Sequence, residues 1–436
     1  MSNQKKQWAA IVIMIALFAM IAFVTNLCTP MATIIKNQLH VSNVLAQVGN
    51  YANFIAYLVM GIPAGMLLKK YGYKKTALIA LATGIVGILI QWLSGSLGDN
   101  ATLVFSVYLI GAFIAGLCMC MLNSVVNPML NLLGGGGNKG NQLIQIGGVF
   151  NSTAAVCVYI LMGALIGDVT RAQISDATPA LLIALAIFAI GFIVILATPI
   201  QEPQQGSNTE SKKEPDRYSA FSFRHFKLGI LAIFFYMGIE VGIPNFIQQY
   251  LTSLPEDPTP GLGMAPSIVG MIVAVYWLLM LVGRFVGGVI GGSVSSRTMI
   301  TTVATITLVL VLFGMLAPTG TTVNVPGIDW ASLTMIWAEV PVGIFAFLLV
   351  GLCTSVMWGG IFNMAVEGLG KYTAMASGAF MTMVFGCAVM QFIQAGIADL
   401  THSYLTSYVV VLLCAAYVLF YALIGSKNVN KDIPTE

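Results

Sequence analysis

The chain has 436 residues, of which 58% are hydrophobic and only 8% are charged. A soluble domain carries about 25% charged residues, so this composition excludes an ordinary soluble protein and indicates a surface that faces hydrocarbon. The net charge of +3 gives no reason to expect a nucleic-acid partner. The seven cysteines lie in apolar stretches without metal-ligand spacing, and we expect neither a metal nor a cofactor.

Apolar runs long enough to cross a bilayer follow one another along the whole chain. A spanning helix needs about 20 apolar residues. Six such runs precede a polar stretch at 201–226, which is typical of a flexible linker, and six follow it. The runs lie at 9–36, 44–68, 76–96, 102–133, 143–166 and 179–200, and then at 227–251, 267–292, 298–317, 341–366, 374–399 and 407–425. We therefore predict an all-α protein of twelve spans, with halves at 1–200 and 227–436.

The distribution of positive charge predicts the orientation. Nearly all of the 19 Lys and Arg residues fall in segments that lie on one side if the chain crosses the membrane twelve times. Basic residues are enriched in cytoplasmic loops. We expect both termini in the cytoplasm, in a multi-pass protein of the plasma membrane.

Weak internal similarity suggests that the two halves are repeats. Gly61 and Gly65 in the second span match Gly283 and Gly287 in the eighth, and Gly-Leu-Cys occurs at both 116–118 and 351–353. Chance similarity between glycine-rich apolar segments is the alternative. Repeated six-helix halves enclose a central site near the membrane midplane.

The segment GMLLKKYGYKKT (65–76) resembles the loop motif between spans two and three of major facilitator superfamily transporters. Gly72 and Lys74 fit that motif, whereas Lys69 stands in place of its aspartate. The resemblance implies alternating access by rocking of two halves. It also implies that Lys69, Gly72 and Lys74 belong to a gate.

A closer resemblance is to the fucose–proton symporter branch, particularly its glucose/galactose transporters. Six segments carry it: IPAGMLLKKYGYKK (62–75), NPMLNLLG (127–134), FNS (150–152), LAIFFYMGIEV (231–241), VGRFVGG (282–288) and EGLGKYT (367–373). The resemblance implies sugar import into bacteria across the inner membrane, driven by protons or, in some members, sodium. Thr29 and Asn123 replace the two carboxylates linked to proton coupling in that branch.

Glu240 is the only acidic residue expected in the middle of a span. A charge at the bilayer centre is costly, so an acid there is a functional hypothesis by default. Glu240 offers a group that exchanges a proton as its surroundings alternate between wet and dry, accepts sugar hydroxyls, or joins a sodium site. The structural alternative is a protonated acid bonded to a neighbouring helix.

Amide side chains are expected in spans of both halves. An amide offers donors and an acceptor, which suits the hydroxyl groups of a sugar. Bonding between helices is the alternative role. With Thr29, one turn from Asn26, the expected polar substrate contacts are Asn26, Asn53, Asn123, Asn127, Asn151, Asn245, Asn363 and Gln391.

Three aromatic residues are candidates for packing against the apolar face of a sugar ring, namely Tyr236, Trp277 and Trp358. Arg284 is the one basic residue within a span. It is expected either to extend to the inner surface or to form a gate ion pair with Glu367.

These features favour secondary active import of a neutral hexose-like sugar by a monomer in the lipid bilayer, with protons or sodium coupled through Glu240. The alternatives are an uncoupled sugar facilitator of the same fold, suggested by Thr29 and Asn123, and an exporter of other small solutes. A membrane enzyme is not expected, because His40, His225 and His402 lie at loops or span ends.

Overall fold

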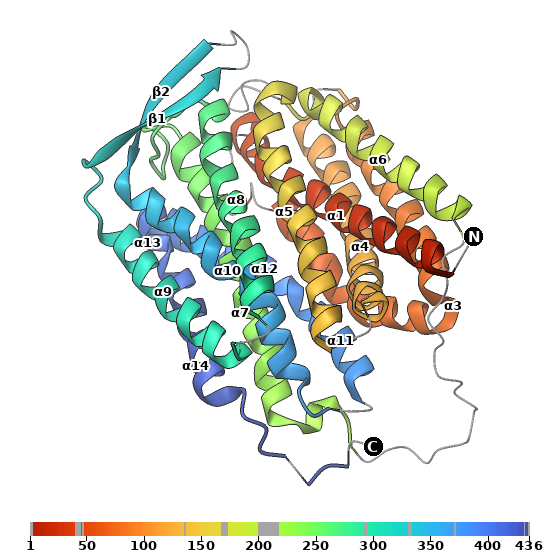
Figure 1. The fold of residues 1–436 in the computed structure, drawn as a ribbon. Coiled ribbons are helices and arrows are strands. Elements are labelled where there is room, and N and C mark those ends of the chain that lie inside the picture. Colours follow the sequence, from red (N-terminus) through yellow and green to blue (C-terminus); the bar gives the residue numbers. More distant parts are fainter. Residues whose placement is uncertain are drawn as a thin grey trace.

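The computed structural model describes residues 3–39, 45, 48–98, 100–134, 137–166, 173–198, 218–291, 294–329, 334–369, 372–430 and 432–434. It is a bundle of long helices in two groups, drawn in red to yellow and in green to blue in Figure 1. The N-terminal group contains α1 (Asn3–Leu39), α3 (Val48–Ser94), α4 (Ala101–Leu133), α5 (Gly137–Ile166), η1 (Ile174–Ala177) and α6 (Thr178–Ala197).

The C-terminal group holds the remaining helices and one small sheet. Its elements are η2 (Ala220–Ser222), α7 (Arg224–Thr252), α8 (Pro266–Ile290), α9 (Ser296–Leu316), β1 (Thr322–Asp329), β2 (Thr334–Pro341), α10 (Val342–Val366), α11 (Thr373–Thr382), η4 (Met383–Phe385), α12 (Gly386–Thr401), α13 (Tyr404–Ser407), α14 (Val409–Phe420) and η5 (Tyr421–Gly425).

Eleven helical stretches in the described part of the chain are long and apolar enough to cross a membrane. Two of them, Tyr51–Leu68 and Lys70–Ser94, lie within α3, which is broken at Gly72, where φ is 77° and ψ is 179°. Glycine suits this left-handed φ, because it lacks a Cβ. The expected fifth span corresponds to α5, whose apolar part is shorter, from Leu143 to Val158. The protein is therefore a multi-pass membrane protein.

The structure differs from the prediction at one boundary and in one connection. The linker was expected to reach 226, but α7 begins at Arg224, and His225 and Phe226 are already buried. Polar residues at 224, 225 and 227 concealed this first turn. The stretch 318–340, which separates two of the predicted spans, contains most of an antiparallel hairpin, which pairs Val325 with Ala338. The protein is thus not purely helical.

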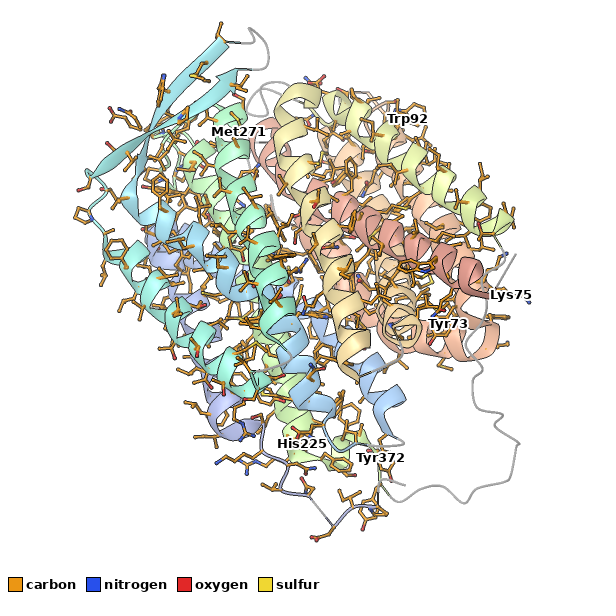
Figure 2. The ribbon with its side chains drawn as sticks, in the orientation of Figure 1. Tyr73, Lys75, Trp92, His225, Met271 and Tyr372 are labelled. Carbon is orange, nitrogen blue, oxygen red and sulfur yellow. The ribbon has the colours of Figure 1, made fainter. Side chains whose placement is uncertain are left out.

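The helix ends gather on two sides, which we call the linker side and the hairpin side. On the linker side, the Gln7 amide donates to the Leu133 carbonyl at 3.1 Å and the Arg224 backbone N–H donates to Asn430 at 2.8 Å. Figure 2 shows His225 and Tyr372 at this end and Met271 near the hairpin.

The two halves touch along α3 and α11. A Cβ on Gly61 would meet the Oγ1 of Thr382 and lie 2.9 Å from its Cα, so the backbones approach closely. Nearer the hairpin side, the rings of Tyr51 and Phe392 meet edge to face at 5.8 Å. Four residues toward the linker side, Gly65 and Gly378 have open space around the Cβ position. The two helices therefore diverge toward the linker side.

Large apolar side chains cover the outer surface of the bundle. Val289 is 70% exposed, Leu316 73% and Leu400 84%. In water such residues would favour aggregation, whereas in a bilayer they contact lipid chains. The polar side chains that the described residues bury lie mainly between helices, where the candidate site is found.

Candidate functional site

A hollow lies between the two halves. Its lining comes from α1, α3, α4 and α5 on one side and from α7, α8, α10, α11 and η4 on the other. The lining residues are Phe18, Ile21, Ala22, Thr25, Asn26, Phe54, Tyr57, Asn123, Asn127, Asn151, Met237, Glu240, Val241, Trp277, Arg284, Trp358, Met381 and Val384.

The N-terminal half contributes a wall of uncharged amides. Asn26 donates to the Ala22 carbonyl at 2.8 Å, and Asn151 donates to the Phe18 carbonyl at 2.9 Å. Asn127 donates to the Asn123 carbonyl at 3.0 Å. In each case the amide nitrogen is held by a helix carbonyl. This arrangement orients the amide groups of the lining.

Asn127 has an unusual feature within this wall. Its side-chain oxygen is buried and has no hydrogen-bond partner among the described residues. A buried acceptor without a donor costs roughly 1–3 kcal/mol. A hydroxyl donor from a ligand in the hollow would remove that cost.

The C-terminal half contributes one charge of each sign. Arg284 Nη2 lies 3.5 Å from Glu240 Oε1, and the two side chains are only 11% and 12% exposed. They are the only charged residues among those that line the hollow. Trp277 and Trp358 line the same side, and Trp358 packs against Tyr236 and Phe380, with ring centroids 6.2 and 5.4 Å apart.

The structure thus brings seven predicted substrate residues to one hollow. The amides on α1, α4 and α5 share this hollow with Glu240 on α7 and with the tryptophans on α8 and α10. Residues from both halves of the chain therefore meet at one place. The seven residues are Asn26, Asn123, Asn127, Asn151, Glu240, Trp277 and Trp358.

Other predicted substrate contacts lie away from this hollow, so their role in binding stays a prediction. Asn53 lines a separate small cavity with Gln91 and Tyr108. Asn245 donates to Gln391 at 2.7 Å, and both are completely buried, as the structural alternative for amides proposed. The periodicity of a helix gives the spacing of its polar residues, but it does not show which neighbour they face.

Three further predictions have different outcomes. Tyr236 is fully buried behind the hollow, where its hydroxyl donates to the Thr354 carbonyl at 3.4 Å. Asn363 lies in an exposed groove with Arg297 and Glu367, at the linker-side end of α10. The side chain of Thr29 lies outside the described residues.

The predicted pairing of Arg284 with Glu367 is wrong. Arg284 pairs with Glu240 in the bundle interior, whereas Glu367 is exposed at the end of α10. The alternative, in which Arg284 extends to the inner surface, fails for the same reason. The position of Arg284 within its span gives its depth in the membrane, but it does not show that Glu240 of α7 lies beside it.

The loop that resembles the family motif contacts its own half. Lys74 donates to the carbonyls of Leu196 at 3.1 Å and Thr198 at 2.8 Å, at the C-terminal end of α6. A cation at this end of a helix is stabilising. Gly72 forms the break in α3, and the side chain of Lys69 lies outside the described residues. These contacts support anchoring of α6, so a gating role for the loop stays a prediction.

Sequence reasoning missed the apolar part of the lining and the partners of Arg284. Phe18, Phe54, Met237 and Met381 carry no polar signal that separates them from ordinary span residues. Thr25 precedes Asn26 and lines the hollow beside it. No cluster of three or more metal-binding side chains occurs in the part of the chain that the structure describes.

Comparison with known proteins agrees with this architecture. The family model of the Major Facilitator Superfamily matches residues 13–391. A glucose/galactose transporter of Brucella abortus is 27% identical over 433 residues, which are 98% of this chain and 96% of the relative. An L-fucose-proton symporter of Escherichia coli is 20% identical, over 95% of this chain and 92% of the relative.

A solved structure is similar in fold. The chain matches the transporter FucP in an outward conformation with a TM-score of 0.70 and 19% identity, covering 96% of this chain and 99% of that one. The similarity extends over both halves and over the elements that line the hollow.

Proposed function

The chain belongs to the major facilitator superfamily, whose members are transporters and not enzymes, and on that premise we propose that it imports a neutral hexose-like sugar by secondary active transport. The observation that carries this proposal is the unpartnered Asn127 oxygen in an amide wall that faces two tryptophans. Hydroxyl groups satisfy amides on one side, and the C–H face of a sugar ring packs on indoles on the other. The glucose/galactose transporters among the relatives support a hexose.

Glu240 is the coupling residue in this proposal. It is the one carboxylate of the hollow, and it lies beside a cation at 3.5 Å. A proton is the favoured coupling ion, and sodium is the alternative. The positive charge on the linker side is expected to place that side in the cytoplasm. An inward gradient of the coupling ion would then drive import, by a monomer in the bacterial inner membrane.

An uncoupled sugar facilitator is the second candidate. Asn123 donates to the Tyr57 hydroxyl at 2.9 Å, so a neutral pair occupies the position where the resembled branch has a carboxylate. Export of other small solutes is a weaker alternative, because a polar, amide-lined wall suits hydroxylated ligands better than amphipathic ones.

Uptake of radiolabelled glucose and galactose into proteoliposomes tests the proposal. Wild type, Glu240→Gln and the control Glu339→Gln are compared with an imposed pH gradient, a sodium gradient and none. Glu339 is exposed on the hairpin, so its substitution controls for loss of a carboxylate as such.

We expect gradient-driven accumulation by wild type and the control, and only sugar exchange by Glu240→Gln. Equilibration without accumulation in wild type would identify a facilitator. Absence of saturable sugar uptake in wild type would overturn the proposal, and competition by lipophilic cations would favour an exporter.

A further inference from the structure

Arg284 joins the two halves as well as pairing with Glu240. Its Nη1 donates to the Gly148 carbonyl at 2.7 Å and to the Ser152 hydroxyl at 2.8 Å, with Asn151 Oδ1 more distant at 3.4 Å. These three acceptors lie on α5 of the N-terminal half, whereas Glu240 lies on α7 of the C-terminal half. One guanidinium therefore bonds to both halves beside the hollow.

The surface of α5 is shaped to receive this guanidinium. A Cβ on Gly148 would lie 3.1 Å from Arg284 Cδ and 3.4 Å from both Nε and Nη1. Glycine at 148 thus leaves the room that the arginine occupies. Ser152 follows one turn later on the same face and is fully buried. The Gly148 carbonyl and the Ser152 hydroxyl accept the two N–H groups of Nη1, which the planar guanidinium holds in a fixed direction.

We propose that Arg284 is a positioning residue for transport, whose contact with Gly148 and Ser152 makes the pairing of α5 with α8 depend on the charge of Glu240. This inference rests on the proposed function, because it assigns a regulator to the same carboxylate.

The dependence follows from the cost of an uncompensated buried charge. With Glu240 ionised, the two charges compensate each other within the C-terminal half, and α5 can move away at lower cost. With Glu240 protonated, the guanidinium keeps only its acceptors on α5, and losing them would leave the cation unpaired. Proton uptake by Glu240 therefore strengthens the α5–α8 contact.

Arg284 is the only charged partner of Glu240 among the residues that line the hollow. The titratable neighbours are tyrosines: Tyr236 on α7, Tyr276 on α8 and Tyr57 on α3. The residues that α1, α4, α5, α10, α11 and η4 contribute to the lining are all uncharged at neutral pH. A pH response of this contact is accordingly assigned to the Glu240–Arg284 pair.

Disulfide formation between α5 and α8 can report this contact without measuring transport. A Cβ on Gly288 would lie 4.0 Å from the Cβ of Gln145, one turn toward the linker side from Arg284. Disulfides need a Cβ separation of about 3.5–4.5 Å. The reporter is Gln145→Cys with Gly288→Cys, in a Cys157→Ser background because Cys157 is exposed.

Cross-linking of this reporter in full-length protein is measured with copper phenanthroline as the added oxidant, as a function of pH. Disulfide formation by itself slows as the pH falls, because the thiolate is the reacting form, so each rate is divided by that of the Glu240→Gln reporter at the same pH. We expect this relative rate to rise towards one as the pH falls, because glutamine imitates the protonated acid at every pH. Ser152→Ala should reduce the rise about tenfold, because a hydrogen bond to a charged group is lost. Arg284→Lys should also flatten the response, because a point charge lacks the planar fork.

Thr153→Ala is the matched control. Thr153 is exposed, and its hydroxyl bonds to the Val149 carbonyl of its own helix at 2.9 Å. It should keep the wild-type response. A relative rate that does not change with pH in the otherwise wild-type reporter, or a wild-type response in Ser152→Ala, would overturn the inference. Failure of the proposed function would appear separately, as absence of sugar uptake by wild type with the cross-linking response intact.

Discussion

The side-chain nitrogen of Asn123 donates to the hydroxyl of Tyr57 at 2.9 Å, which joins α4 to α3 within the lining of the hollow. The tyrosine is otherwise buried, with 3% of its surface exposed. This bond fixes the direction of one amide without any charge. Two uncharged side chains from different helices thus hold each other in place in the lining of the hollow.

Tyr57→Phe should weaken sugar binding while leaving the maximal rate within about twofold. The substitution removes one acceptor that orients Asn123, and a hydrogen bond contributes roughly 0.5–1.5 kcal/mol. The KM for sugar exchange should therefore rise about three- to tenfold. Tyr71→Phe, which alters an exposed ring on the same helix, serves as the control. An unchanged KM would mean that Asn123 is oriented without Tyr57.

Asn127→Leu separates a binding residue from a structural one. Leucine removes the buried oxygen that has no partner, so the melting temperature should stay level or increase. Sugar affinity should fall about tenfold, measured as KM for exchange or by direct binding. Ser106→Ala, an exposed hydroxyl elsewhere on α4, controls for the helix. Loss of stability with unchanged affinity would contradict a role in binding.

Gly61→Ala should slow transport by forcing α3 away from α11. The new Cβ would lie 2.9 Å from the Thr382 Cα and 3.0 Å from its backbone nitrogen, and backbone cannot yield as a flexible side chain does. We expect the exchange rate to fall at least fivefold. Gly65→Ala is the matched control, since nothing lies within 4 Å of its Cβ position. Equal rates for the two variants would refute close contact at Gly61.

Asn245→Ala should lower stability and spare sugar affinity. Asn245 donates to Gln391 at 2.7 Å in a completely buried pair. Removing the donor costs about 1–3 kcal/mol. Each kcal/mol lowers the melting temperature by roughly 2–4 °C in a domain of 150–250 residues. Thermal unfolding in detergent measures the loss, with exposed Asn324→Ala as control. A raised KM at unchanged stability would restore Asn245 to the binding site.

The sequence predicted most of the helices, because apolar length is the dominant signal in a membrane protein. It did not reveal the hairpin, in which alternating residues such as Val323 and Val325 follow a polar stretch. It also placed the linker boundary too late, since Phe223 and Phe226 are buried among polar neighbours. Helix ends depend on contacts with distant segments, as the bond from Arg224 to Asn430 illustrates.

The candidate site was predictable for residues whose chemistry is costly to bury. Glu240 and the α4 amides stood out because a polar group inside a span requires a reason. The partners were not predictable. Gly148 carries no distinctive signal, and Ser152 belongs to the segment FNS (150–152), which does not reveal its partner, so only the packing of α5 against α8 shows that they meet Arg284.

The hairpin has a practical consequence for studying this protein. Gly327 of β1 packs against Ile268 and Met271 of α8, and the opposite face leaves Met335 and Trp337 more than 60% exposed. Figure 1 shows the hairpin over the C-terminal group. An antibody fragment that binds the hairpin should move together with α8 as one rigid unit. It would enlarge a small particle for electron cryomicroscopy without restricting the motion of one half relative to the other.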